Sequence, residues 1–344
     1  MKKFDVVIIG CGPAGVSSAQ VLLKNNVNFC MIDKEVFPRK KLCAGGLTDK
    51  SINILNDLGL EYQSVVKSEC STFKLKTKKK TRDLMVKRSI LMVDRTEFDN
   101  HNLEQIKKMT NNVFEGESII DIDDNIVTTN KDKYEFKYIV FADGVNGYSR
   151  KFSQLKNVGY SVEIDVQKRN DEDITISFDT LRDGYAWIFP KGNYSTIGLG
   201  KFKNVKDDYK KLLKDFCLAN DVEFDERQVR GFPIPAGGYI KKAVMDNKIL
   251  VGDAAALVDP ISGEGIYYAL VSGKYAAEVI TKKLQDNKVN LKREYNVKMI
   301  KSHLILSYKR FTSRIFYSPL KHFLIRLAYS NRLLLNLGVY IVFL

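Results

Sequence analysis

The sequence of 344 residues predicts an α/β protein with a Rossmann-like βαβ domain, an inserted antiparallel-sheet domain and a helical C-terminal tail. Three observations support this fold class. An apolar run over residues 4–9 leads into a glycine-rich turn and then a helical pattern. Short alternating segments dominate residues 63–92 and 156–237, as in antiparallel strands. Beyond residue 285 the pattern is helical and strongly basic.

The first unit carries GCGPAG at residues 10–15. In such a strand–turn–helix, Gly10 permits the tight turn, Gly12 lets the backbone approach a pyrophosphate, and Gly15 lets the helix pack on the strand. The helix N-terminus adds unpaired N–H groups and a partial positive charge. The next strand ends in Asp33, where a carboxylate would accept hydrogen bonds from a ribose. Glycine clusters also form ordinary turns, but the flanking strand and helix favour a dinucleotide site.

Three later segments favour FAD as the dinucleotide. One apolar strand ends in an Asp-Gly turn at Asp143, suited to lie beside a cofactor. Arg95 opens a predicted helix. Another strand ends in Asp253, which is placed to hold ribityl hydroxyls, and a helix of small residues begins near Gly265. The positive end of that helix would face the pyrimidine edge of the flavin, where negative charge gathers on reduction.

At these positions the chain resembles the FAD-dependent geranylgeranyl reductase family, within the para-hydroxybenzoate-hydroxylase-like flavoproteins. The matching pieces span about four fifths of the chain: GCGPAG, KLCAGGL at 41–47, Arg95, ADG at 142–144, YAWIFP at 185–190, and GD at 252–253 through GI at 265–266. Two positions depart from the family pattern, since Ala44 replaces a usual glycine and Asp33 stands where the larger group often has Glu. The resemblance implies bound FAD, and with the motifs above it gives these cofactor-binding candidates: Gly10, Gly12, Ala14, Gly15, Asp33, Cys43, Ala44, Gly46, Arg95, Asp143, Asp253, Gly265 and Ile266.

We expect the chain to divide into three parts. The expected FAD-binding domain comprises residues 1–62, 93–155 and 238–285, the antiparallel-sheet substrate domain comprises 63–92 and 156–237, and the basic amphipathic tail comprises 286–344. The pattern predicts helices over 48–58, 95–109 and 207–219, a hairpin over 71–92, strands over 159–166, 174–178, 186–189 and 195–200, and a Pro/Gly-rich crossover over 231–239.

The redox step belongs to the flavin, while protein groups position it and supply protons. Tyr185 and Trp187 share one face of a predicted strand. They are expected to form an aromatic wall for a long apolar substrate, although such pairs are often plain core residues. In the family, the cysteine at Cys43 lies by the flavin ring and takes part in catalysis; the alternative is a small space-filling residue. Cys43 and Tyr185 are the catalytic candidates for proton donation, whereas Glu264 fits better as a helix N-terminal charge.

The net charge of +14 is concentrated at the C-terminal end, where residues 291–344 hold ten Lys or Arg and one Glu, or 10 − 1 = +9. Leu304, Tyr308, Phe311 and Ile315 repeat there at helical spacing, and residues 333–344 are almost uncharged. A basic amphipathic helix with exposed aromatics suits an anionic membrane surface. A solvated helix face, or docking of 333–344 into the core, are the competing interpretations. No nucleic-acid recognition motif accompanies the charge.

Five cysteines without paired spacing and three scattered histidines favour a reducing compartment and no metal site. Neither a signal peptide nor an apolar run of about 20 residues is present. The expected location is therefore the cytoplasm, with peripheral attachment to the inner face of the cell membrane as a further expectation.

The leading hypothesis is an FAD-dependent oxidoreductase that reduces carbon–carbon double bonds of an isoprenoid lipid or quinone side chain, as the resemblance implies. One alternative is a flavin monooxygenase that hydroxylates or epoxidises an apolar substrate. Another is a non-catalytic, membrane-peripheral flavoprotein. Since no second strand–glycine-loop–helix unit follows, electrons are expected from a transiently docked NAD(P)H or from a small redox protein.

Overall fold

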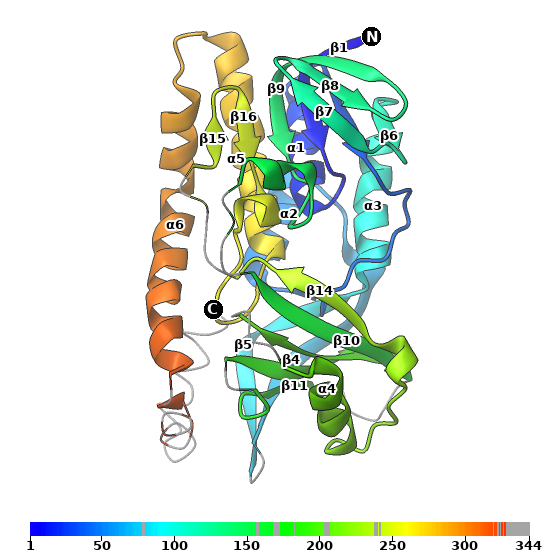
Figure 1. Ribbon diagram of the computed structural model, residues 1–344, viewed down its shortest axis with the longest axis vertical. Coiled ribbons are helices and arrows are strands. Elements are labelled where there is room, and N and C mark those ends of the chain that lie inside the picture. Colours follow the sequence, from blue (N-terminus) through cyan, green and yellow to red (C-terminus); the bar gives the residue numbers. More distant parts are fainter. Residues whose placement is uncertain are drawn as a thin grey trace.

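Two eight-stranded sheets, one above the other in Figure 1, form the framework of the protein and confirm the predicted α/β class. The computed structural model describes residues 1–77, 80–153, 155, 158–167, 173–181, 183–202, 207–236, 240, 242–318, 320, 321, 323, 325 and 327, with only the backbone at 86–88.

The sheet that carries the glycine-rich turn, called sheet A, has the strand order β15-β16-β9-β1-β2-β6. The central strand β1 pairs in parallel with β2 and β9, so that Val7 lies opposite Cys30 and Ile139. A β7–β8 hairpin joins the sheet antiparallel to β9. The unbroken apolar runs of β1 and β2 follow from burial on both faces. Its strands are β1 (Lys2–Ile9), β2 (Phe29–Asp33), β6 (Val113–Glu115), β7 (Ile119–Asp123), β8 (Ile126–Thr129), β9 (Lys133–Phe141), β15 (Val244–Met245) and β16 (Lys248–Leu250).

The second sheet, called sheet B, has the order β14-β10-β13-β12-β11-β4-β5-β3. Its neighbouring strands are antiparallel except β11 and β4, which pair in parallel. The hairpin predicted over 71–92 is present and longer than expected. The strands are β3 (Gly46–Leu47), β4 (Val66–Lys76), β5 (Thr81–Val93), β10 (Gly159–Gln167), β11 (Ile174–Ser177), β12 (Gly184–Lys191), β13 (Tyr194–Lys201) and β14 (Arg230–Ile234).

The Pro/Gly-rich crossover predicted over 231–239 begins instead as strand β14, which pairs antiparallel with β10. Gly231 lies opposite Val162, and Pro233 lies opposite Tyr160. Proline is tolerated here because β14 is the outermost strand of sheet B, where its missing N–H breaks no inner ladder. Local composition therefore misled the sequence interpretation. Residues 237–239 lie outside the described part of the chain.

Small residues let two helices of sheet A approach each other closely. A Cβ at Gly273 of α5 would lie 2.1 Å from the carbonyl oxygen of Ala14 in α1. The hydroxyls of Ser17 and Ser18 donate across the same contact to the carbonyls of Leu270 and Gly273, at 2.6 and 2.9 Å. This contact sets the N-termini of α1 and α5 beside one another. The helices are α1 (Pro13–Lys24), α2 (Asp49–Leu58), α3 (Arg95–Lys107), α4 (Tyr209–Leu218), α5 (Ile266–Gln285) and α6 (Leu291–Phe316).

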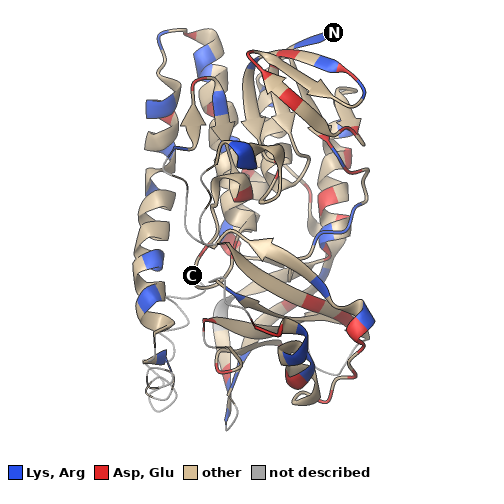
Figure 2. Ribbon diagram, viewed as in Figure 1, with Lys and Arg blue, Asp and Glu red and all other residues tan. Residues whose placement is uncertain are grey.

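The last helix, α6, runs beside α5 along one side of the molecule and reaches toward sheet B (Figure 1). Its inner side is buried at Tyr295, Met299 and Leu306, and Lys309 pairs at 2.5 Å with the fully buried Asp259. Basic side chains recur along it, as Figure 2 shows. Within the described residues, no helix combines the length and hydropathy that a bilayer crossing requires. The apolar segment 333–344 lies outside the described residues.

Candidate functional site

The carboxyl ends of the parallel strands of sheet A meet one face of sheet B at a cavity of about 620 Å³. The turns after β1, β2, β9 and β16 all reach this cavity, which is where open α/β sheets bind ligands. Its volume is typical of a cofactor or ligand site. All but Gly15 of the predicted site residues line it: Gly10, Gly12, Ala14, Asp33, Cys43, Ala44, Gly46, Arg95, Asp143, Tyr185, Trp187, Asp253, Gly265 and Ile266.

The three glycines of the first turn occupy different environments. Gly10 has φ +102°, and a Cβ there would lie 2.4 Å from the carbonyl oxygen of Ala142. A Cβ at Gly15 would lie 1.9 Å from the carbonyl oxygen of Gly10, so the helix can pack on the turn only with glycine there. Around Gly12 the nearest atom is Arg39 Nη2 at 3.5 Å, which leaves its cavity side open. No side chain caps the N-terminus of α1, so its N–H groups remain available to an anion.

Two predicted carboxylates hold backbone in place at the cavity wall. Asp33 accepts hydrogen bonds from the N–H groups of Cys11 at 2.7 Å and Glu35 at 2.9 Å, and so ties β2 to the glycine-rich turn. Asp143 accepts from the N–H and hydroxyl of Ser149 at 2.8 and 2.6 Å. Burial raises the pKa of Asp143 to about 6, against the lowering effect of these two bonds. The ribose and cofactor roles predicted for Asp33 and Asp143 stay predictions.

A buried cationic cluster also lines the cavity. Arg95 makes a two-pronged ion pair with Asp99, with both contacts at 2.8 Å, and Arg39 reaches the same carboxylate at 3.0 Å. Burial opposes ionisation of Asp99, but Arg95 beside it holds the pKa of that carboxyl below its ordinary value. Lys41 lines the cavity as well, and burial lowers its pKa to about 8. Sequence reasoning did not include Arg39 among the site residues, although the basic run after β2 was the available signal.

Both backbone polar groups of Cys43 are hydrogen-bonded to side chains of sheet B. The N–H of Cys43 donates to Glu163 Oε1 at 3.0 Å, and Lys191 Nζ donates to the carbonyl oxygen of Cys43 at 3.5 Å. The next glycine, Gly45, has φ +79°, and a Cβ there would lie 2.1 Å from the carbonyl oxygen of Val93. The guanidinium of Arg95 lies within hydrogen-bonding range of the Cys43 side chain. The loop is therefore held rigidly against the cavity.

The predicted aromatic pair lies on β12, where both side chains are buried at the cavity. The rings of Tyr185 and Trp187 are 5.6 Å apart, and Phe189 and Phe202 continue the cluster at 6.4 Å from Trp187 and 5.9 Å from Tyr185. The indole lies over Gly198, where a Cβ would be only 2.4 Å from Cζ2. This cluster makes the sheet B side of the cavity apolar, as a wall for an apolar substrate requires.

The N-terminus of α5 lies at the cavity beside Asp253. No side chain caps this helix at Gly265, and the Asp253 carboxylate has no hydrogen-bond or ion-pair partner among the described residues. Glu264 just before the helix accepts hydrogen bonds from the Thr48 hydroxyl at 2.5 Å and from Lys50 at 3.2 Å. Two uncapped helix N-termini and a free carboxylate suit a dinucleotide with an anionic pyrophosphate and hydroxyl groups.

Comparison with known proteins supports this interpretation of the geometry. Residues 3–168 match the FAD binding domain family. An uncharacterised protein of Methanosarcina barkeri is 32% identical over 93% of this chain and 85% of its own. Digeranylgeranylglycerophospholipid reductase 2 of Methanosphaera stadtmanae is 29% identical over 90% of this chain and 86% of its own. FAD is the cofactor, and the protein is an FAD-dependent oxidoreductase.

Solved structures show the same fold. A geranylgeranyl bacteriochlorophyll reductase-like protein from Thermoplasma acidophilum matches with a TM-score of 0.80 and 22% identity, covering 92% of this chain and 88% of its own. A probable FAD-dependent monooxygenase from Pseudomonas aeruginosa matches with a TM-score of 0.72 and 16% identity, covering 93% of this chain and 97% of its own. Reductases and monooxygenases thus share this architecture, and the fold alone does not select between their reactions.

Proposed function

The chain belongs to the FAD-dependent geranylgeranyl reductase family, and on that premise we propose that it hydrogenates carbon–carbon double bonds of an isoprenoid lipid or quinone side chain. The observation that carries the proposal is the buried aromatic cluster around Tyr185 and Trp187, which faces the Cys43 loop across the cavity. The apolar faces of these rings can pack against an apolar chain. The reductase named above supports the same substrate class.

Residues that line the cavity support a proposal for how FAD is held. The uncapped N-terminus of α1 at Gly12 would bind the pyrophosphate, Asp33 the adenosine ribose and Asp253 the ribityl hydroxyls. The uncapped N-terminus of α5 at Gly265 would favour negative charge on the flavin pyrimidine. FAD, when bound and reduced, supplies the hydride for the double bond. The protein's part is to orient the alkene, exclude water and provide a proton.

The contacts of Tyr185 favour a positioning role over a role as proton donor. Its hydroxyl donates to the carbonyl oxygen of Ser262 in the loop before α5, so its proton is already engaged. Burial also raises the pKa of Tyr185, which makes it a poor acid near neutral pH. The bond joins sheet B to the loop beside the flavin site, and it would fix the distance between substrate wall and cofactor.

An anaerobic titration tests whether the protein turns over a lipid. Protein loaded with FAD and reduced chemically is expected to be reoxidised by an isoprenoid lipid, with one double bond consumed per FAD. A fully saturated lipid of the same length is the control and should leave the flavin reduced. Absence of reoxidation by any unsaturated lipid would instead favour the non-catalytic flavoprotein. Reduction by NAD(P)H, compared with reduction by a small redox protein, identifies the class of electron donor.

A monooxygenase is the second candidate because a protein of that named class shares the fold. It differs in requiring oxygen and in adding an oxygen atom to its substrate. Turnover in the absence of oxygen therefore separates the two reactions.

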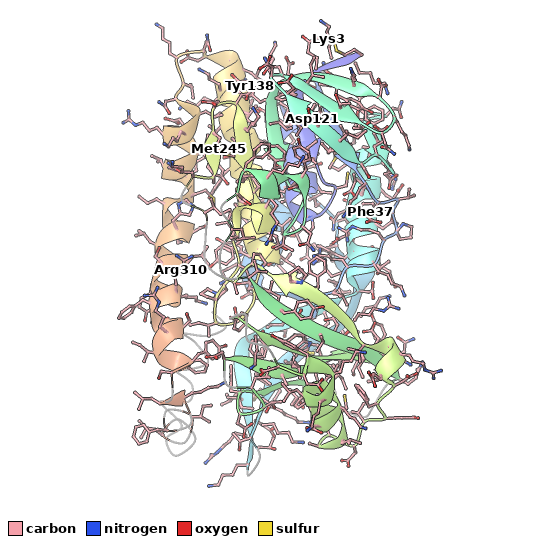
Figure 3. All side chains as sticks on the ribbon, viewed as in Figure 1. Lys3, Phe37, Asp121, Tyr138, Met245 and Arg310 are labelled. Carbon is pink, nitrogen blue, oxygen red and sulfur yellow. The ribbon has the colours of Figure 1, made fainter. Side chains whose placement is uncertain are left out.

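We also propose that α6 attaches the protein to the cytoplasmic face of an anionic membrane. Six exposed apolar side chains follow one line along the helix, at intervals of three and four residues: Val297, Ile300, Leu304, Tyr308, Phe311 and Ile315. We call this set the α6 stripe. Side chains project outward along this helix, where Figure 3 labels Arg310. Lys301 and Arg314 flank the stripe on opposite sides at helical spacing, as anionic headgroups would favour.

Introducing two negative charges into the α6 stripe is expected to abolish membrane binding. The double variant Leu304→Glu/Phe311→Glu replaces side chains that are 65% and 62% exposed, so the fold should be retained. Each substitution removes apolar area that would be buried in the membrane, and each adds a negative charge that anionic lipid repels. Sedimentation with vesicles of anionic phospholipid measures the effect, and we expect at least a tenfold loss of binding. Ile120→Glu, at an isolated exposed position on β7, is the control. Equal binding by the double variant and wild type would reject the proposal.

A further inference from the structure

Hydrogenation of a double bond requires an acid, and the predicted donor Tyr185 is not well suited to that role. Its proton is engaged by the Ser262 carbonyl. Another proton-bearing group at the cavity would complete the chemistry. A general acid must lie within reach of the substrate and hold its proton near the working pH.

Glu163 lies on the side of sheet B that lines the cavity. On β10 it is opposite Gly198 of β13, which is opposite Trp187 of β12. Residues directly opposite in adjacent antiparallel strands share one face, so the carboxyl and the indole lie in one row across the sheet. Because Gly198 has no side chain, the Cζ2–Cε2 edge of the indole covers it, between the two residues. The carboxyl and the aromatic wall therefore line one continuous surface of the cavity.

The surroundings leave one oxygen of Glu163 uncommitted. Oε1 accepts the hydrogen bond from Cys43, whereas Oε2 has no hydrogen-bond partner among the described residues. The residue is only 9% exposed, and no described lysine or arginine lies within ion-pair distance of it. Trp187 Nε1 is likewise buried without a partner in the described part of the chain. Polar atoms left open on an apolar cavity wall are suited to act on a ligand.

Charged groups face Glu163 from four elements, and the exposed Arg230 of β14 lies directly opposite it in the strand register. Lys191 from β12 and Lys41 from the Cys43 loop favour the carboxylate, while Asp165 on the same strand opposes it. Burial outweighs these effects and raises the pKa of Glu163 to about 7. About half of the molecules therefore carry this proton at neutral pH and most carry it below neutral pH, and the carboxylate can regain it from water.

We propose that Glu163 is the acid that protonates the substrate double bond. The inference rests on the proposed function. One alkene carbon takes the hydride from the reduced cofactor, and the other takes the proton from Glu163 Oε2. The carbon–carbon π bond, the O–H bond and the bond that held the hydride on the reduced cofactor break, and two C–H bonds form. The cofactor loses two electrons to the substrate, and the carboxylate left behind recovers a proton from solvent. The hydrogen bond from Cys43 to Oε1 fixes the carboxyl plane, which makes the Cys43 loop a positioning element for this acid.

Glu163→Gln tests the assignment because glutamine can still accept the Cys43 hydrogen bond but carries no acidic proton. We expect at least a 100-fold slower reoxidation of the reduced, FAD-loaded protein by unsaturated lipid, with FAD affinity unchanged. In wild type the rate should fall about tenfold per pH unit above pH 7, as the acid is lost, and this dependence should disappear in the variant. Glu69→Gln, at an exposed carboxyl on β4 of the same sheet that does not line the cavity, is the control and should keep wild-type rates.

The protonation state of the Glu163 carboxyl can also be measured without cofactor or turnover. Infrared spectra of the cofactor-free protein should show a protonated carboxyl band that titrates near pH 7 and is missing from Glu163→Gln. If wild type is active and Glu163→Gln reoxidises within threefold of it, or if the band is unchanged by the substitution, the assignment of Glu163 is wrong while the proposed function stands. If wild type hydrogenates no lipid, the proposed function fails and the inference with it.

Discussion

Arg95→Met is expected to destabilise the protein by about 3–5 kcal/mol, because it leaves the buried Asp99 without its two-pronged partner. Asp99 is fully buried, and among the described residues Arg39 at 3.0 Å would remain as its ion-pair partner. Since folded proteins are stable by about 5–15 kcal/mol, a loss of this size removes a large part of the total. The variant should also take up FAD poorly, because Arg95 lines the cofactor cavity and contacts the Cys43 loop.

Urea unfolding of the cofactor-free protein measures this loss, and its pH dependence gives a second check. In wild type the pKa of Asp99 is held below its ordinary value, so its contribution to stability is present above that value and is lost as pH falls. In the variant the protonated form of Asp99 is favoured. The loss in free energy of unfolding relative to wild type should therefore be largest at neutral pH and smaller in acid. Lys107→Met on the same helix removes partly exposed ion pairs and should cost less than about 1 kcal/mol. Equal effects of the two substitutions would contradict the buried-pair account.

Substitutions in the glycine-rich turn are expected to affect folding and FAD binding differently. Gly15 is needed for folding, whereas Gly12 is needed for FAD binding. Gly15→Ala should destabilise the cofactor-free protein by about 1–3 kcal/mol or more, because its Cβ would overlap the Gly10 carbonyl oxygen. Gly12→Ala should cost less than about 1 kcal/mol, since its Cβ meets only the flexible end of Arg39 at 3.5 Å. Yet it should weaken FAD binding at least tenfold, about 1.4 kcal/mol, because the pyrophosphate would approach that backbone.

Thermal unfolding without FAD and a fluorescence titration with FAD measure the two quantities separately. Gly59→Ala is a control outside the cavity lining, with a positive φ of +71° and only Lys24 Nζ, at 3.7 Å, near the added Cβ. It should show only the backbone cost of that conformation, about 1–2 kcal/mol. Wild-type FAD affinity in Gly12→Ala would show that the pyrophosphate does not lie against this turn.

The features that could be predicted from sequence are those set by neighbouring residues. The roles of Gly10 and Gly15 depend on a turn and a helix within six positions of each other, so the GCGPAG pattern predicts them directly. Tyr185 and Trp187 alternate on one strand, and their shared face follows from strand geometry. The family resemblance located Cys43 and Asp253, which line the cavity as expected.

Other features depend on contacts between distant segments, which no local pattern encodes. Glu163 meets Cys43 across 120 positions of sequence, and nothing around it on β10 marks it as different from a surface carboxylate. In the sequence, Lys309 is one of many basic residues in the tail. In the fold it is buried against Asp259 beside the site. Pairing with β10 similarly converts part of the predicted crossover into β14. In each case tertiary burial, rather than local composition, determines the role.

The mass of the lipid after anaerobic turnover tests the central claim most directly. Reduced, FAD-loaded protein incubated with an unsaturated isoprenoid lipid should yield a product that is heavier by two hydrogen atoms per double bond consumed, with or without oxygen. A product that gains one oxygen atom and forms only in air, or a lipid recovered unchanged while the flavin stays reduced, would contradict it.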